Sequence, residues 1–254
     1  MYLFIFIVNR YSSRTHIHDL SHVNINLPEY YNFFEEYPEC DFRNYTQECG
    51  NCYAHSAINM ISHRFCRETH QQIFLSPQYV VACDFLNAGC FGGNERIVLT
   101  NLEHIGATNI SCHPWTNTTH YSYNYCHKCS TNEQFKIYKI QRNSIQHYIG
   151  VENIKKAIYT QGPVSSCLVC DETFHHYQSG IFKSGIPYLD LQTEYYVNHS
   201  IELVGWGKEG DTEYWILHNQ FGTNWGENGN MKIQMHSNEG FIEDYCYGAL
   251  PLIE

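Results

Sequence analysis

The sequence predicts an α+β protein in which a helical first half and a β-rich second half meet at a cleft. Apolar residues recur at helical spacing between residues 52 and 105. After residue 163, short β-rich runs are separated by glycine turns. The chain has 254 residues, 43% of them hydrophobic, which is enough for one large domain or for two lobes sharing a cleft. Helices and strands segregated along the chain are typical of the α+β class.

The first 26 residues differ from the rest of the chain. "MYLFIFIV" is an apolar run too short to span a bilayer, and polar residues without periodicity follow it. We interpret residues 1–26 as a leader or residual pro-segment, with the apolar run as a short signal peptide, and residues 27–254 as the folded domain. A misassigned start is the alternative, because no basic residue precedes the run. No other segment has the apolar length to cross a membrane.

Three helices are expected in the first half. "CYAHSAINMISHRFC" begins with Cys52 and carries apolar residues at helical spacing, with no Gly or Pro inside. A second helix starts at "SPQYVVACDF", with Ser76 as its cap and Pro77 at its first position. Residues 84–94 are expected to be a loop and residues 94–105 a third helix. Cys52 would therefore lie in the first turn of a buried helix.

The residue pattern of the second half differs from that of the first. Residues 110–135 are rich in Asn, Thr, Tyr and Cys and predict a surface loop stapled by disulfides. A helix is expected near residues 151–161. Four runs then favour a twisted antiparallel sheet or barrel: "QGPVSSCLV", "SIELVGWG", "EYWILHNQF" and "NMKIQMH".

The amino-acid composition indicates which cellular compartment and which binding partners suit the protein. The net charge of -11 leaves no basic field for a nucleic-acid partner. Twelve cysteines indicate several disulfides in an oxidising or secretory compartment. The 16 histidines suit an acidic compartment, where they would gain charge. Four Asn-X-Ser/Thr sequons agree with a secreted glycoprotein, at Asn44, Asn109, Asn117 and Asn198.

The stretch "QECGNCYAHSA" (residues 47–57) allows three interpretations. A redox pair normally precedes a helix in a βαβ unit, and no parallel-strand pattern surrounds this one. A zinc site needs a second compact pair, which neither "CHKC" nor "CLVC" supplies. The third interpretation makes Cys52 a nucleophile and Cys49 structural. A thiol in the first turn of a helix faces unpaired N–H groups and the positive end of the helix dipole, which favour its thiolate.

That nucleophile needs a histidine partner and a group that orients it. His199 in "VNHSIELVGWG" lies at the mouth of a β run, and Asn219 in "YWILHNQFGTNWGENG" follows an apolar strand. An asparagine can accept the other ring N–H and hold the tautomer without adding charge.

These segments resemble the papain-like cysteine peptidases. The resemblance rests on "CGNCYAHSA", "GCFGG", "NHSIELVGWG" and "HNQFGTNWGENG", in order and spacing, and covers nearly everything from Leu27 onward. It implies a two-lobe fold with a helical left lobe, a β-barrel-like right lobe and an active-site cleft between them.

Within the family, several segments most resemble the cathepsin X branch, also called cathepsin Z. They are "CYAHS", "NAGCFGGNE", the cysteine-dense "ISCHPW…NYCHKC" and the ending "EDYCYGALPLIE", while "LPEYYNF" resembles the start of the mature enzyme in that branch. The resemblance implies a lysosomal exopeptidase that mainly removes single residues from peptide C-termini.

The resemblance also assigns roles. Cys52 matches the nucleophile, His199 the base and Asn219 the orienting residue. The Cys52 backbone N–H would form half of the oxyanion hole, and Gln47 is the nearby amide that could form the other half, although it lies closer to the nucleophile than is usual.

Three further residues match substrate-binding positions. Gly92 and Gly93 correspond to cleft-wall glycines that let the substrate backbone approach. Asn198 is placed to offer its carbonyl to substrate.

The chain departs from the family pattern at several points. Tyr53 replaces the usual Trp after the nucleophile, and Gln220-Phe221 replaces the Ser-Trp pair after Asn219. "FRNYTQEC" is too short for the histidine-bearing insertion with which cathepsin X captures the substrate C-terminus. These departures predict weakened or altered exopeptidase specificity.

The resemblance implies two disulfides, Cys49–Cys90 and Cys167–Cys246. Four more cysteines are expected to form two bridges whose pairing stays open: Cys83, Cys112, Cys126 and Cys129. Three stay unassigned: Cys40, Cys66 and Cys170.

Other histidines have simpler interpretations. His55, on the same helix as Cys52, is expected to be a core or wall residue. The His175-His176 pair is expected at a surface turn, because adjacent histidines chelate a metal poorly without further ligands.

The sequence thus predicts a cysteine-type peptidase acting by a Cys–His–Asn mechanism on peptide or protein substrates, as a monomer. No metal or organic cofactor and no nucleic-acid or membrane partner is expected, and the lysosome or extracellular space is the expected location. The alternative, motivated by Tyr53, Gln220 and Phe221, is a catalytically inactive homologue that binds partners through the cleft.

Overall fold

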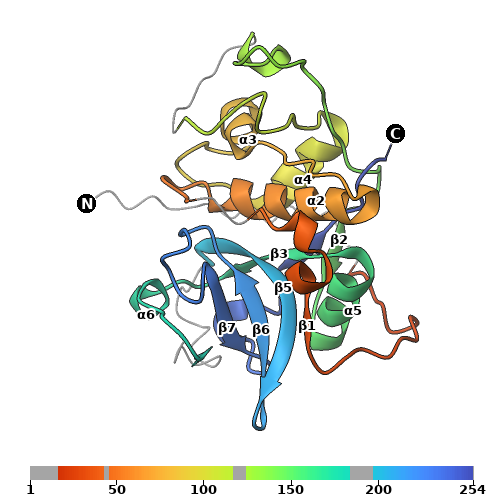
Figure 1. Ribbon diagram of the computed structural model, residues 1–254, viewed down its shortest axis with the longest axis vertical. Helices are drawn as coiled ribbons and strands as arrows, with labels where there is room; N and C mark the ends of the chain where they lie inside the picture. Colours follow the sequence, from red (N-terminus) through yellow and green to blue (C-terminus); the bar gives the residue numbers. More distant parts are fainter. Residues whose placement is uncertain (1–16, 43–45, 117–123, 184–196, 254) are drawn as a thin grey trace.

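The computed structural model describes residues 17–42, 46–116, 124–183 and 197–253. Its buried hydrophobic residues form two cores, one in a helical lobe and one in a lobe built on a sheet. Figure 1 shows the helical lobe above and the sheet below. The long strands lie in the sheet lobe, where α1, α5 and α6 pack against them, and α2, α3 and α4 form the core of the other lobe. The α+β prediction is confirmed.

The described residues form α-helices, short 3₁₀ turns and β-strands. The α-helices are α1 (Phe33–Glu36), α2 (Cys52–Thr69), α3 (Pro77–Cys83), α4 (Glu95–His104), α5 (Val151–Gln161) and α6 (Glu172–His175). The 3₁₀ turns are η1 (Pro38–Cys40), η2 (Tyr125–His127) and η4 (Glu239–Phe241). The strands are β1 (Tyr31–Asn32), β2 (Gln146–Tyr148), β3 (Val164–Leu168), β4 (Ile181–Phe182), β5 (His199–Glu209), β6 (Thr212–His218), β7 (Asn230–Gln234) and β8 (Cys246–Gly248).

Helix α2 begins at the residue that the sequence predicted. Cys52 is its first residue, and apolar side chains such as Ile58 and Phe65 pack in the helical core. The helix ends after Thr69, because the backbone of the capping residue His70 is left-handed (φ 53°) and cannot continue the helix.

Local capping explains the next helices. The Ser76 hydroxyl accepts the backbone N–H of Tyr79 at 3.0 Å, with Pro77 at the first helical position of α3. The Asn94 side chain accepts the N–H of Arg96 at 2.9 Å and starts α4. The helices predicted near these positions and the helix near residues 151–161 are confirmed.

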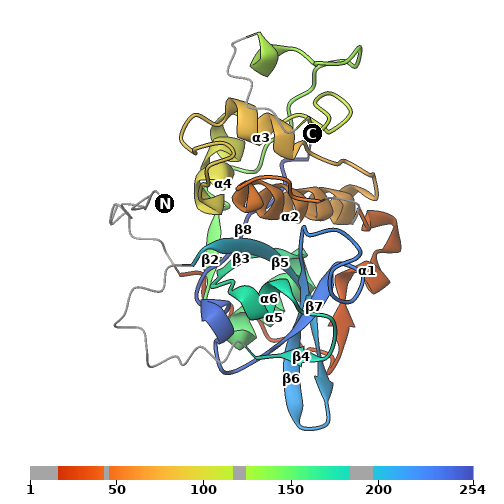
Figure 2. The ribbon, with the colours of Figure 1, turned by 90° about the vertical axis from the view of Figure 1, so that its left-hand side faces the viewer.

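The sheet has the strand order β2-β8-β3-β5-β6-β7-β4, and β1 pairs with β5. All of these pairings are antiparallel except that of β4 with β7. Within the described residues β2 and β4 are the two ends of the path, so the sheet is open, and the barrel-like right lobe is a curved sheet that does not close. Figure 2 shows α2 lying across the sheet between the lobes.

Polar side chains of α2 bind β5. The Ser56 hydroxyl donates to the Ile201 carbonyl at 2.5 Å. Further along the helix, His63 Nδ1 lies 2.7 Å from a carboxylate oxygen of Glu202, and both side chains are buried. These contacts fix the position of the helix along the strand.

Arg64 ties the same helix to other parts of the chain. Its guanidinium is fully buried and donates to three backbone carbonyls: Pro163 at 2.8 Å, Ala249 at 3.0 Å and Gly162 at 3.2 Å. A buried guanidinium is stable only when its donors are paired, so these carbonyls hold the charge in place.

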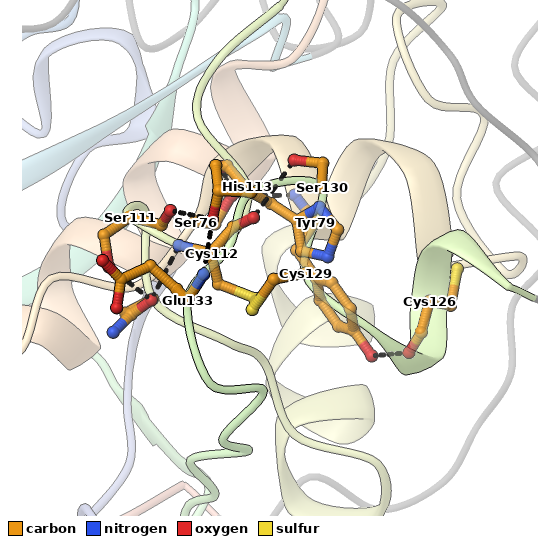
Figure 3. Close-up of a disulfide and its surroundings, with 11 residues drawn as sticks. Ser76, Tyr79, Ser111, Cys112, His113, Cys126, Cys129, Ser130 and Glu133 are labelled. Atoms are coloured by element: carbon orange, nitrogen blue, oxygen red, sulfur yellow. Dashed lines mark hydrogen bonds between the residues drawn. A yellow bond between two sulfur atoms is a disulfide. The ribbon is translucent and has the colours of Figure 1, made fainter.

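Four disulfides link the described residues: Cys40–Cys66, Cys49–Cys90, Cys83–Cys126 and Cys112–Cys129. The Cys49–Cys90 bridge is confirmed. The four cysteines whose pairing was left open pair as Cys83 with Cys126 and Cys112 with Cys129. Figure 3 shows Cys112–Cys129, which closes this loop on itself, and the Ser76 hydroxyl at the cap of α3, which donates to the His113 carbonyl of the loop at 2.6 Å. The Cys40–Cys66 pairing was not predicted, since both cysteines were left unassigned.

The expected Cys167–Cys246 disulfide is wrong, because both thiols are free. Cys246 on β8 lies opposite Ser166, whereas the neighbouring Cys167 lies opposite Ser200 on β5. Successive side chains of a strand point to opposite faces of the sheet, so the two sulfurs lie on different faces.

Residues 17–26, the described part of the predicted leader, lie along the β lobe. Leu20 is buried, its N–H donates to the Asn153 side chain at 3.0 Å, and its carbonyl accepts from Lys156 at 3.1 Å. The apolar run and the sequons at Asn44 and Asn117 fall outside the described residues. In the part of the chain that is described, no helix has the length and hydropathy to cross a membrane.

We predict that Arg64→Met lowers the free energy of unfolding by about 3 kcal/mol, because it leaves three buried carbonyls without their donors. The melting temperature should fall by roughly 6–12 °C. The control Arg142→Met replaces an exposed arginine and should change it little. Equal melting temperatures for the two variants would contradict the assigned role of Arg64.

Candidate active site

Cys52 stands at the start of α2, where the two lobes meet. It is half-buried with a free thiol, whereas Cys49 is bonded to Cys90. That bridge removes Cys49 as a redox or metal partner of Cys52. Gly50 lets the loop pass close to Cys90, since a Cβ at Gly50 would lie 2.8 Å from the Cys90 carbonyl oxygen.

His199 and Asn219 are brought together by the pairing of β5 with β6. Nε2 of His199 lies 2.8 Å from Oδ1 of Asn219, and both side chains are buried. The backbone N–H of Gln220 donates to the same oxygen at 2.9 Å, which agrees with its assignment as the acceptor. His199 therefore donates from Nε2, and in the neutral ring Nδ1 is the nitrogen that can accept a proton.

Ser200 connects the thiol with this pair. It follows His199 on β5, and hydrogen bonding from its backbone N–H and hydroxyl lowers the pKa of the Cys52 thiol. The start of α2 thus meets the start of β5, as the predicted cleft between the lobes requires.

Burial controls the charge of both groups. It raises the pKa of the Cys52 thiol, an effect that the hydrogen bonds from Ser200 oppose and the charge of Glu95 reinforces. It lowers the pKa of His199 to about 4, against the effect of the hydrogen bond to Asn219. At mildly acid to neutral pH Cys52 is therefore a thiol and His199 a neutral imidazole.

Aromatic rings shield the imidazole. Phe221 stacks on His199 with ring centroids 5.0 Å apart and an angle of 28° between the planes. Trp225 meets Phe221 edge-on at 5.6 Å, and His175 stacks on Phe221 at 5.4 Å. Phe221 thus covers the His199–Asn219 hydrogen bond in the place of the usual Trp.

The arrangement of a free thiol, a histidine and an asparagine can be compared with known proteins. The chain matches the papain family of cysteine proteases over residues 37–250. It belongs to this family. The matched range contains Cys52, His199 and Asn219.

Several of the curated relatives are cathepsin B-like. Cathepsin B-like CP2 of Giardia intestinalis is 29% identical over 190 residues, which cover 73% of this chain and 61% of that protein. Cathepsin B-like protease 1 of Arabidopsis thaliana is 30% identical over 177 residues, covering 64% and 45%. The chain therefore spans about three fifths of the Giardia protein and less of the plant one. Papain-family membership is confirmed, whereas the cathepsin X branch is not.

Solved structures agree on the fold. Procathepsin B S9 from Trypanosoma congolense superposes with a TM-score of 0.81 at 22% identity, covering 95% of this chain and 84% of that one. A structure from a study of the mite allergens Blo t 1 and Der p 1 has a TM-score of 0.78 at 22% identity, covering 93% and 75%. The predicted papain-like fold is confirmed.

The departure at Tyr53 is compensated locally. Its hydroxyl donates to the Gly89 carbonyl at 2.9 Å, and its ring is fully buried. A Cβ on Gly93 would lie 2.7 Å from this ring, so Gly93 makes room for Tyr53. The roles of Gly92 and Gly93 as a papain-like cleft wall stay predictions.

Gln47 and Asn198 have local partners. The Gln47 amide donates to the Cys49 carbonyl at 2.8 Å, and its second N–H is the one that could reach an oxyanion. The Asn198 side chain makes two hydrogen bonds to the backbone of Cys170, at 2.7 and 3.0 Å. Their roles toward substrate stay predictions.

Sequence reasoning missed a buried group beside Cys52. The group consists of Glu95 on α4, Cys167 on β3 and Ser200 on β5, whose side chains contact one another. The signal in the sequence that could have pointed to them is their position: Glu95 comes shortly after Gly92 and Gly93, and Ser200 comes directly after His199.

The other histidines lie as expected. His55 is buried with its ring 5.7 Å from that of Trp115, and burial lowers its pKa to about 4. His175 and His176 are exposed, which confirms the surface interpretation, although His175 also stacks on Phe221. Among the described residues, no group of three or more His, Cys, Asp or Glu is arranged to hold a metal ion.

We predict that Phe221→Ala raises the pKa of His199 from about 4 toward its ordinary value of 6.5. Removing the stacked ring admits water, which favours the imidazolium, so the shift should be about one pH unit or more. The measurement is an NMR titration of the histidine in a Cys52→Ala background, where no thiolate interferes. Phe85→Ala, which removes an exposed phenyl ring, is the control. An unshifted titration in Phe221→Ala would show that the stack does not bury the ring.

Proposed function

We propose that this protein is a thiol-dependent peptidase with Cys52 as its nucleophile, His199 as its base and Asn219 as the orienting residue. The observation that carries the proposal is that α2, which begins with the free Cys52 thiol, packs against β5, which begins with the buried His199 whose Nε2 lies 2.8 Å from Asn219 Oδ1. Membership of the papain family supports it.

The chemistry follows from this geometry. His199 Nδ1 takes the proton of Cys52, and the sulfur attacks the scissile carbonyl. The backbone N–H of Cys52, in the first turn of α2 where helical N–H groups lack intrahelical partners, stabilises the oxyanion. His199 then protonates the leaving amine, and water activated by the same ring hydrolyses the acyl-enzyme.

A finer proposal is exopeptidase action at the C-terminus of the substrate. Because His199 protonates the leaving amine, the C-terminal part of the substrate lies on the side of this ring. Thr46 forms a β-bridge with Phe221, and the Gln47 N–H donates to the Gln220 carbonyl at 2.7 Å, so residues 46–47 run along that side. The exposed imidazole of His175, stacked on Phe221, offers a basic group there for a terminal carboxylate.

The catalytically inactive alternative stays the competing proposal. The Gln220 and Phe221 substitutions motivate it, and the intact Cys52, His199 and Asn219 set argues against it. The proposed substrates are peptides or proteins. The four disulfides and the cathepsin-like relatives support a secretory location, with the lysosome as the finer proposal.

We predict that Cys52→Ala lowers the kcat/KM of peptide hydrolysis by at least about 10⁴-fold with the fold intact, because the nucleophile is lost. An electrophilic epoxide should label Cys52 at acid pH in the wild-type protein. Cys170→Ala, which removes another free and half-buried thiol, should retain hydrolysis. Persistent activity in a clean Cys52→Ala preparation would refute the mechanism, and a wild-type protein that neither hydrolyses nor labels would support the binding alternative.

We also predict that peptides with a free C-terminal carboxylate are cleaved about fivefold faster than their amides, which is the effect of one exposed ion pair. His175→Ala should remove this preference, while His176→Ala should keep it. The measurement is kcat/KM on matched peptide pairs at pH 5. Equal rates for acid and amide in the wild-type protein would favour endopeptidase action.

A further inference from the structure

One buried carboxylate joins helix α2 to strands β5 and β6. Glu202 on β5 is 1% exposed. Its Oε1 lies 2.7 Å from Nδ1 of His63 on α2, and its Oε2 lies 3.3 Å from Nδ1 of His218 on β6. Both imidazoles are buried as well. Carboxylates are rarely buried unless they are paired, so this arrangement calls for an explanation.

The three elements carry or directly precede the proposed catalytic residues. α2 begins with Cys52, and β5 begins with His199, three residues before Glu202. β6 ends at His218, and Asn219 is the next residue. The carboxylate therefore links the three segments on which the proposed peptidase geometry depends.

The backbone pairing of β5 with β6 is short on this side of the sheet. A register shift begins after Leu203 and interrupts the ladder, as β-bulges do. Between this shift and the end of β6, the described strands keep two register pairs, and Glu202 opposite His218 is the last of them. The side-chain contact between these two residues strengthens the pairing directly before Asn219.

A second side-chain tie lies just beyond Asn219. The Gln220 amide donates to the Ser200 carbonyl on β5 at 2.6 Å. Asn219 therefore stands between two contacts that fasten its segment to β5. The first of them also reaches the helix, because the Glu202 carboxylate that meets β6 meets His63 of α2 as well.

An ionised carboxylate fixes a proton on both imidazoles. Burial would raise the pKa of Glu202, but the charges and hydrogen bonds of His63 and His218 outweigh burial and hold that pKa below its ordinary value. The ionised group accepts hydrogen bonds and cannot donate them, so Nδ1 of each ring carries a proton. Both contacts are directional, and a shift of either partner would leave buried charge unpaired.

Aromatic rings enclose the cluster. Three phenyl rings lie around His63, with centroid distances of 5.9 Å for Phe33, 5.0 Å for Phe34 and 5.4 Å for Phe42. The Phe34 ring also meets His218 edge-on at 5.6 Å. Among the described residues, the two imidazoles are the hydrogen-bond partners of the carboxylate, so the loss of either contact is not made good by another side chain.

We propose that this carboxylate and its two imidazoles are positioning residues. Glu202, His63 and His218 hold α2, β5 and the end of β6 in one arrangement. In that arrangement Asn219 Oδ1 stays 2.8 Å from His199 Nε2. The effect on catalysis rests on the proposed peptidase activity, whereas the effect on the His199 ring can be measured without hydrolysis.

The decisive variant is Glu202→Gln. Its amide keeps the shape but offers one acceptor and one donor group, so it cannot accept from both imidazoles. The Nε2–H of His199 should then exchange with solvent about tenfold faster, because its hydrogen bond to Asn219 is open more of the time. The measurement is the exchange rate of this proton in ¹H–¹⁵N NMR spectra, below the melting temperature of each variant.

The same spectra test the arrangement of protons. In the wild-type protein Nδ1 of both His63 and His218 should carry a proton. In Glu202→Gln one of the two should lose it, because the amide N–H₂ group needs an acceptor. A wild-type protein in which either Nδ1 is without a proton would overturn the proposal.

Glu213→Gln is the matched control. Glu213 lies near the start of β6, away from Asn219, and its carboxylate also meets an imidazole, with 2.7 Å to Nε2 of His236. This variant should leave the exchange of the His199 proton unchanged. His218→Asn keeps a side-chain N–H for the carboxylate and should stay close to the wild-type rate, whereas His218→Phe should behave like Glu202→Gln.

Peptide hydrolysis gives the second readout. Glu202→Gln should lower kcat about tenfold with KM little changed, because the base is less well oriented while the cleft is kept. A merely structural role predicts a lower melting temperature with unchanged exchange of the His199 proton and unchanged kcat, and that result would overturn the proposal.

Failure of the peptidase assignment gives a different result. A wild-type protein that does not hydrolyse peptides, but in which Glu202→Gln still speeds exchange of the His199 proton, would refute the peptidase and support the positioning role. Where Glu202→Gln does not fold, the comparison of His218→Phe with His218→Asn decides the question by the same measurement.

Discussion

The buried polar seam between α2 and β5 is the constraint on which the rest of the site depends. Near the start of α2 the Ser56 hydroxyl donates to the Ile201 carbonyl, and further along His63 meets Glu202. Polar groups buried in this way are costly unless they are paired, so the helix cannot slide along the strand without leaving several of them unsatisfied. An apolar interface would tolerate such a shift far better. The seam thus fixes α2, which begins with Cys52, against β5, which begins with His199.

The same burial that positions the pair sets its chemistry. Desolvation disfavours both the thiolate of Cys52 and the imidazolium of His199, so the resting site is neutral. In the proposed mechanism, charge appears only when the proton moves between them, and Asn219 Oδ1, 2.8 Å from His199 Nε2, is already in place to stabilise the imidazolium. The Phe221 ring, stacked on His199 with ring centroids 5.0 Å apart, covers one face of the imidazole.

Local patterns in the sequence predicted much of the fold. The start of α2 at Cys52, the Ser76 cap of α3 and the β runs at the end of the chain are encoded within a few residues, where periodicity and capping act. The expected Cys167–Cys246 disulfide failed for the opposite reason. It depended on the sheet face that each sulfur takes, and that face follows from the register among β3, β5 and β8.

The sequence by itself determined the order of Cys52, His199 and Asn219, the helix and strands that carry them and the family to which they point. Only the tertiary structure decided that Cys49 bonds to Cys90, that Cys167 stays free and that Glu95 joins Ser200 beside the nucleophile. The physical reason is the range of the forces involved. Backbone propensity and capping act over a few residues, whereas the meeting of α4, β3 and β5 depends on how all the buried surfaces of the chain pack at once.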